Sequence, residues 1–216
     1  MARAYDELDE QILDAALTRI LQVGIRRASL DDIARRTGIN RVTIYRRFAG
    51  KDNVVDAVLS REIERILGEV TAITRSAPDV DTQIEETVLY ILRLTRTHPL
   101  VVQLIEVAPD EALSFYTVRG EEMVSQGIAY ISGILESAQQ RGAIRRYDTR
   151  PVAELVARLA HSLLLTPQAG VDFADADAAR AFVRTTIVPM MKYGFPAAAG
   201  GAGDSDVSRA DTAAGA

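Results

Sequence analysis

The chain has 216 residues, of which 48% are hydrophobic and 25% charged, and its formal net charge at pH 7 is −5. These values are ordinary for a globular protein of one domain, or of a small head joined to a larger body. The chain has no cysteine and only two histidines, His98 and His161, which excludes a disulfide scaffold, a thiolate metal site, a cysteine nucleophile and a histidine-rich metal centre.

The first eleven residues are acidic and polar, which is not the pattern of a signal or transit peptide. The longest apolar runs are shorter than the roughly 18 residues that a membrane-spanning helix needs. We therefore expect a cytoplasmic protein that makes no membrane contact and carries no metal or cofactor.

The charges are unevenly distributed. Segment 26–51 has eight basic and two acidic residues, a net charge of +6, whereas segments 1–25 and 52–216 have net charges of −3 and −8. A basic segment beside an acidic body could bind a polyanion through one face, or it could be a solvated helix face. Charge alone leaves both readings open.

Nearly every periodic segment predicts a helix. Apolar residues recur at helical spacing from Ile12 through Ala16 and Ile20 to Val23, and Gly24 predicts the end of this first helix. In the next segment, Ser29 and Asp32 form a capping-box pattern at the start of a second helix.

Segment 29–48, SLDDIARRTGINRVTIYRRF, has the layout of a helix-turn-helix. Gly38 separates its two helices, because glycine readily adopts the positive φ of a tight turn. The helix over 41–48 would be about 12 Å long, which fits a DNA major groove roughly 12 Å wide. Ile44 and Phe48 would pack inward. The opposite face carries the candidate DNA-binding side chains, Arg41, Val42, Thr43, Arg46 and Arg47, with Tyr45 at its edge.

A fourth helix starts near Lys51 and connects this head to the rest of the chain. The pattern stops at Ala77-Pro78-Asp79, the best candidate for a hinge between head and body. Pro189 should kink or end the last helix. Further helical segments are predicted at 82–97, 100–107, 112–140, 151–165 and 174–193.

The predicted fold is therefore all-α, since no segment alternates for long enough to predict a strand. Residues 1–50 form an N-terminal three-helix head with a helix-turn-helix. Residues 51–195 form a helical body for ligand binding and dimerisation. Residues 196–216, rich in alanine and glycine, form a tail that we expect to be disordered.

The head has a specific pattern of residues at fixed spacings. It consists of ILDAAL in the first helix, Gly24, SLDDIARRTGIN, Tyr45 with Phe48, and Lys51-Asp52 before an apolar helix. With these, residues 10–60 resemble the TetR family of bacterial transcriptional regulators. Asn40 departs from the family, which often has serine there, and Asn53-Val54-Val55 replaces a commoner acidic-then-leucine run.

The resemblance implies a division of roles on the third helix. Arg41 and Val42 would face base edges, with Arg46 as a further candidate, because an arginine can read guanine through two hydrogen bonds. Arg46 or Arg47 could equally clamp a phosphate. Alternatively, Arg41 is a plain surface arginine.

The resemblance also implies phosphate contacts. Thr43 and Tyr45 would touch phosphate through their hydroxyls, unless Tyr45 is a half-buried packing residue. Lys51 and the first N–H groups of the fourth helix would hold another phosphate, a task that suits a helix N-terminus.

Two C-terminal segments, 151–166 and 174–193, are apolar on nearly every side. A helix that is apolar all round must be buried on both sides, so we expect these segments to form the interface of a homodimer. A twofold dimer would place two recognition helices about one DNA turn apart on a pseudo-palindromic operator of double-stranded DNA.

The other body helices would enclose a pocket for a small, hydrophobic or amphiphilic effector. Plain core is the competing interpretation for each apolar candidate, and a satisfied core or interface histidine is the competing one for His161. The candidate lining residues are Leu89, Leu92, Leu104, Ile105, Phe115, Tyr116, Met123, Tyr130 and His161.

The sequence thus predicts a ligand-responsive, DNA-binding transcriptional regulator, a repressor that a small, mostly apolar molecule releases from its operator. The alternative is a helical partner-binding or architectural protein with non-specific DNA affinity. An enzyme is disfavoured, because the chain has no G-x-S-x-G elbow, no H-E-x-x-H motif and no P-loop.

Overall fold

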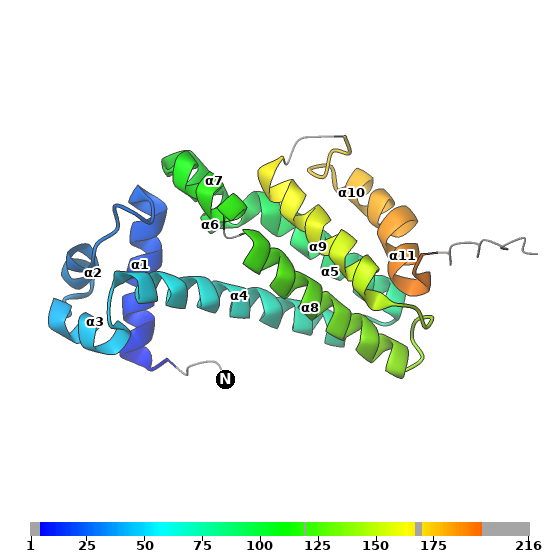
Figure 1. Cartoon of the computed structure of the whole chain (residues 1–216), viewed down its shortest axis with the longest axis horizontal. Coiled ribbons are helices and arrows are strands. Elements are labelled where there is room, and N and C mark those ends of the chain that lie inside the picture. The colour runs from blue at the N-terminus through cyan, green and yellow to red at the C-terminus, as the bar shows by residue number, and fades with distance from the viewer. Residues whose placement is uncertain (1–4, 119, 167–169, 196–216) are drawn as a thin grey trace, which may run out of the picture.

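A computed structural model describes residues 5–118, 120–166 and 170–195, and every regular element within them is a helix (Figure 1). The predicted tail, 196–216, lies outside the described residues. The elements are α1 (Glu7–Val23), α2 (Leu30–Thr37), α3 (Arg41–Phe48), α4 (Lys51–Ser76), α5 (Val80–Thr97), α6 (Pro99–Val107), α7 (Pro109–Val118), α8 (Gly120–Gln140), α9 (Thr149–Leu165), α10 (Ala176–Phe182), the π-helical turn η1 (Val183–Ile187) and α11 (Val188–Tyr193).

Local side-chain chemistry sets the ends of the head helices. The Ser29 hydroxyl accepts a hydrogen bond from the Asp32 amide at 3.1 Å, which confirms Ser29 as the cap of α2. The Asp32 carboxylate accepts from the Ser29 hydroxyl at 2.8 Å, so the second contact of the predicted capping box is made with the hydroxyl rather than with the Ser29 backbone amide. Gly38 ends α2 with a φ of +72°, as predicted. Asn40 then caps α3 by accepting a hydrogen bond from the Val42 amide at 2.8 Å.

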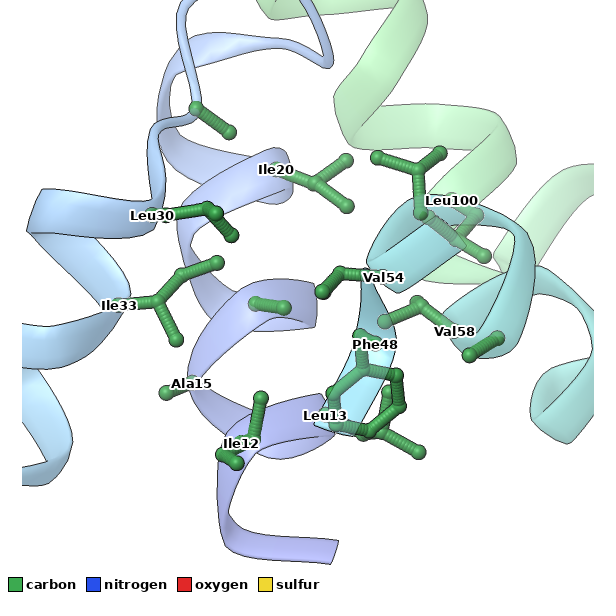
Figure 2. Packing of buried hydrophobic residues seen from close by; sticks show 14 of the residues in the cluster. Ile12, Leu13, Ala15, Ile20, Leu30, Ile33, Phe48, Val54, Val58 and Leu100 are labelled. Atoms are coloured by element: carbon green, nitrogen blue, oxygen red, sulfur yellow. The ribbon is translucent and has the colours of Figure 1, made fainter. Parts of the chain in front are cut away.

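The head and part of the body share one apolar core. Ile12, Leu13 and Ile20 on α1 are fully buried between α2 and α3 on one side and α4 and α6 on the other (Figure 2). The same cluster includes Leu30, Ile33, Ile44, Phe48, Val54, Val58, Leu100, Leu104, Ala112 and Tyr116. The three head helices are therefore packed against body helices rather than enclosing a separate core.

A second apolar cluster lies at the other end of the molecule. It joins α5 and α8 to α9, α10, η1 and α11, and contains Val152, Leu135 and Val183 among its most buried members. Helix α4 runs from the head along the body between the two ends (Figure 1).

A buried polar cluster also connects the head to α4. The Arg61 guanidinium on α4 contacts the carboxylates of Glu10 at 2.8 Å and Asp14 at 2.9 Å on α1. Next to Arg61, the buried Glu62 lies 3.6 Å from the His98 ring, before α6. Burial lowers the His98 pKa from its ordinary value, and the neighbouring Glu62 partly offsets that effect.

The structure tests three predictions about where the body helices begin and end. The break at 76–81 is confirmed, because α4 ends at Ser76 and α5 begins at Val80. The single helix predicted over 112–140 is wrong, since it is divided into α7 and α8. The helical run does not end at Pro189: the α-helix gives way to the π-helical turn η1 before it, and Pro189 lies in the first turn of α11, where a missing N–H is tolerated.

The shared core predicts a large cost for truncating α1. Ile20 is 1% exposed, so Ile20→Ala should lower the free energy of unfolding by about 2–5 kcal/mol through lost burial and an unfilled cavity. Urea titration at a fixed protein concentration measures this loss. Ile63→Ala, at a 45% exposed position, is the control and should change stability by less than about 0.5 kcal/mol.

Candidate nucleic-acid interface

Burial of one side of α3 determines which of its side chains face solvent. Ile44 and Phe48 are buried against α1 and α4, so side chains on the far side of the helix point to solvent. Val42 is 72% exposed and Arg46, one helical turn further on, is also exposed. Tyr45, 59% exposed, borders this face. Helices α2 and α3 lie at the end of the molecule away from the body (Figure 1).

The three arginines of α3 have different surroundings. The Arg47 Nη1 donates to Asp6 at 2.7 and 2.8 Å and to Asp9 at 2.8 Å, which joins the end of α3 to the start of α1. Arg41 pairs with Asp31 of α2 at 3.1 Å, and both side chains are largely exposed. For Arg46, no hydrogen bond or ion pair occurs within the described ranges.

The contacts of Arg47 lower the pKa of Asp6. Hydrogen bonds from Arg47 are the main cause that lowers the pKa of Asp6 below its ordinary value of 3.8. Because the folded-state pKa is lowered, this contact stabilises the fold above the unfolded-state pKa, and the stabilisation is lost as the pH falls through the folded-state pKa.

A basic surface hollow of about 410 Å³ lies beside the outward face of α3. Lys51, at the start of α4, donates from its Nζ to the Arg26 carbonyl at 2.7 Å. Gly50 precedes α4 and gives it no side-chain cap, so the first amides of α4 are available to an anion. The hollow is lined by Arg26, Arg27, Ala28, Ser29, Leu30, Asp31, Arg41, Tyr45, Gly50 and Lys51.

Sequence reasoning missed Arg26 and Arg27 as site residues, although both lie in the basic segment 26–51. Their place depends on how the loop between α1 and α2 folds back toward α4. Helix caps and residue spacing do not indicate that contact, whereas the excess of positive charge in segment 26–51 points to both arginines.

Helix α7 contacts the same loop. A Glu111 carboxylate oxygen accepts a hydrogen bond from the Arg26 amide at 3.0 Å. Gly24, with a φ of +85°, approaches so closely that an added Cβ would lie 2.8 Å from the Ala108 Cβ. Glycine is thus required here both by backbone conformation and by the close approach of Ala108, between α6 and α7.

The predicted effector-binding residues do not lie in one place. Leu89 and Leu92 pack in the second cluster, whereas Leu104, Phe115, Tyr116 and Met123 pack in the shared core with the head. Ile105 and Tyr130 are exposed.

Two polar members of that predicted set are engaged with the backbone. The Tyr116 hydroxyl donates to the Leu100 carbonyl at 3.3 Å, and burial raises the pKa of Tyr116 to about 12. A ring nitrogen of His161 lies 2.8 Å from the Tyr116 carbonyl oxygen, so this histidine has a hydrogen-bond partner.

Two kinds of site are absent from the residues that the structure describes. In the described part of the chain, no group of three or more histidine, aspartate or glutamate side chains is arranged to hold a metal ion. No helix in the described ranges is long and apolar enough to cross a membrane.

The arginine contacts predict that Arg47 and Arg46 act differently. Arg47→Ala should lower the thermal unfolding midpoint, because Asp9 is only 3% exposed and would lose a charged partner. The difference from wild type should shrink as the pH falls below about 4, where Asp6 is protonated in the unfolded chain. Arg46→Ala is the control, and calorimetry should find its midpoint unchanged. Equal midpoints for both variants would contradict a structural role of Arg47.

Comparisons with known proteins match this geometry. Residues 12–58 match the family described as bacterial regulatory proteins, tetR family. An HTH-type transcriptional regulator of Mycobacterium bovis is 28% identical over 157 residues, which cover 71% of this chain and 78% of that protein.

Solved structures share the fold over most of the chain. The TetR family repressor AlkX of a Dietzia strain, implicated in biodegradation of n-alkanes, has a TM-score of 0.60 at 20% identity, covering 84% of this chain and 96% of AlkX. The transcriptional regulator FadR of Bacillus subtilis, solved in complex with stearoyl-CoA, has a TM-score of 0.53 at 16% identity, covering 87% of this chain and 99% of FadR. The head, residues 12–58, is thus a DNA-binding domain of the bacterial tetR family, and the chain as a whole resembles HTH-type transcriptional regulators in sequence and TetR-family repressors in fold.

Proposed function

We propose that this regulator is a repressor that binds a pseudo-palindromic operator as a twofold homodimer in the cytoplasm, and that a small amphiphilic molecule releases it. The observation that carries the proposal is the outward face of α3. There, Val42 and Arg46 are exposed, and Arg46 has no ion-pair partner among the described residues. Arg41 and Tyr45 of the same helix line the basic hollow at Lys51. A hydrophobic and a cationic side chain on one solvent-facing helix can read DNA but stabilise little in the free protein.

Val42 and Arg46 are the proposed base-reading pair. They lie one turn apart at the centre of the outward face, where a valine can contact a thymine methyl group and an arginine can bind guanine through two hydrogen bonds. Arg41 can join them only by leaving Asp31, which costs little because both partners are largely exposed. Arg47 is proposed to support the fold rather than to contact DNA.

The phosphate contacts are proposed at the hollow. Lys51, the uncapped amides of α4 and the side chains of Arg26 and Arg27 surround a space that one phosphate group would fit. Thr43 and the Tyr45 hydroxyl remain candidates for the flanking phosphates. These contacts would fix the register of α3 without reading sequence.

The dimer interface is proposed over 151–166 and 174–193. Large apolar side chains in and next to these segments are exposed in the single chain, among them Leu155, Leu165, Tyr193 and Phe195. Covering them with a second copy would remove this apolar surface from water. The proposal is that the two copies pack α9 and the α10–α11 region against one another.

The effector is proposed to carry a long hydrocarbon chain. Leu89 and Leu92 on α5 provide an apolar stripe inside the body. Support also comes from AlkX and FadR, two fold relatives of which one is implicated in n-alkane biodegradation and the other is solved with stearoyl-CoA. Because the candidate side chains are packed together here, a ligand would bind a body conformation in which α5 and its neighbours have separated.

Capture of sheared genomic DNA by the purified protein, followed by sequencing, tests the proposal. We expect one or a few pseudo-palindromic sites to be enriched at physiological salt. Arg46→Ala should weaken binding to such a site by about 1–3 kcal/mol and relax preference at one position. Lys51→Ala should weaken binding to all sequences alike and reduce the slope of log affinity against log salt concentration by about 0.9.

Two outcomes would contradict this assignment. Diffuse retention without a common site would favour an architectural protein with non-specific DNA affinity. A fully retained sequence preference in Arg46→Ala would remove Arg46 from the base-reading role.

The hydrogen bond between Glu111 of α7 and the loop that joins α1 to α2 predicts that α7 also affects DNA binding. Glu111→Ala should weaken operator binding several-fold, because the loop that carries Arg26 loses its acceptor on α7. Glu111→Gln keeps an oxygen acceptor and should bind nearly as tightly as wild type. Fluorescence anisotropy with the captured site measures both, and equal losses would mean that the charge of Glu111 matters rather than its hydrogen bond.

A further inference from the structure

Helix α5 contains a partly buried arginine, Arg96, with side-chain N–H groups that have no acceptor among the described residues. Among the residues that the structure describes, Arg96 alone has two buried side-chain nitrogens, Nε and Nη1, without a hydrogen-bond partner. Burying N–H groups of a guanidinium without an acceptor costs free energy, because the hydrogen bonds to water are lost and not replaced. Arg19 and Arg61 each have one such nitrogen, but both guanidinium groups contact carboxylates.

The position of Arg96 aligns with the apolar stripe of α5. It follows Leu92 by four residues and Leu89 by seven, so the three side chains lie on one face of the helix. Leu92 is buried and Leu89 partly buried in the second cluster. Arg93, on another face of the same helix, is exposed. The buried nitrogens of Arg96 therefore lie at the end of an apolar stripe inside the body.

The buried carboxylates that pack near α5 already have cationic partners. Glu85 binds Arg180 and Arg184, and Glu62 contacts Arg61, Arg65 and His98. An anion that satisfies Arg96 would therefore come from outside the described chain. A guanidinium fits the two oxygens of a carboxylate or phosphate group, and Leu89 and Leu92 fit a hydrocarbon chain.

We propose that Arg96 binds the anionic headgroup of an amphiphilic effector, whose hydrocarbon chain packs along Leu89 and Leu92. This inference rests on the proposed function, which has the body bind an amphiphile, and it adds that the ligand carries an oxyanion. In the absence of ligand, the two buried N–H-bearing nitrogens of Arg96 lack an acceptor, which destabilises the body. Binding the anion removes that penalty, which favours the ligand-bound conformation.

The test compares ligands that differ only in the headgroup. Full-length protein is titrated with saturated fatty carboxylates, with the methyl esters of the same chains and with matching alkyl phosphates, all below micelle-forming concentrations. Isothermal titration calorimetry gives the dissociation constants, so no operator is needed. We expect wild type to bind the carboxylate or the phosphate at least about tenfold more tightly than the ester, because only the charged groups accept charge-assisted hydrogen bonds. The two anionic series distinguish which oxyanion is preferred.

Two arginine variants isolate the headgroup contact. Arg96→Met keeps a long apolar side chain and should bind anion and ester alike, with the affinity of wild type for the ester. Its unfolding midpoint without ligand should equal or exceed that of wild type, because two buried N–H groups without an acceptor are gone. Arg93→Met is the matched control and should keep the wild-type preference. If Arg96→Met does not fold, Arg96→Lys, which retains the charge without the planar fork, should keep part of the preference.

The outcomes separate this inference from the function on which it rests. Wild type that binds ester and anion equally, or Arg96→Met that discriminates as wild type does, would overturn the role of Arg96 while amphiphile binding stands. Wild type that binds none of the three series would overturn both the amphiphilic effector and the headgroup site.

Discussion

The packing of α1 is the constraint on which the rest of the structure depends. Its buried residues contact the helix-turn-helix on one side and α4 and α6 on the other, so one apolar cluster includes both the DNA-facing helices and part of the body. A boundary near residue 50 divides the chain by motif, but the core continues across it. Helix α3 packs on α2 and α4, and both of these pack on α1, so the buried side chains Ile12, Leu13 and Ile20 of α1 connect the helix-turn-helix to the body.

Carboxylates on α1 and α2 decide which arginines of the head are available. Asp6 and Asp9 bind Arg47, and Asp31 binds Arg41, so the net charge of segment 26–51 overstates the charge presented to DNA. What remains on the outward face is Arg46 together with the cations of the hollow. The acidic residues of the head thus direct a basic segment toward one surface rather than merely diluting its charge.

The features predicted correctly from the sequence depend on residues a few positions apart. The Ser29 cap and the Gly38 turn are of this kind, since capping and backbone conformation are local. The contact of Arg47 with Asp9 joins residues 38 positions apart, and nothing in either neighbourhood indicates it. The effector-binding set was less predictable for another reason. Helical periodicity shows that Leu104 faces inward, but not whether it faces a cavity, a neighbouring helix or the head.

Two contacts between body and head can couple ligand binding in the body to operator binding by the head. Helices α6 and α7 contribute Leu104 and Tyr116 to the head core, and Glu111 to the loop that carries Arg26 and accepts a hydrogen bond from Lys51. If the proposed ligand separates α5 from its neighbours, the movement would be passed to α6, which follows α5 after a single residue and packs against it. A hundredfold change in operator affinity requires only about 2.8 kcal/mol of coupling, and operator DNA must weaken ligand binding by the same factor. Loss of the Glu111 hydrogen bond and of part of the apolar contact at Tyr116 is a change of that size, so a small displacement of α6 and α7 suffices.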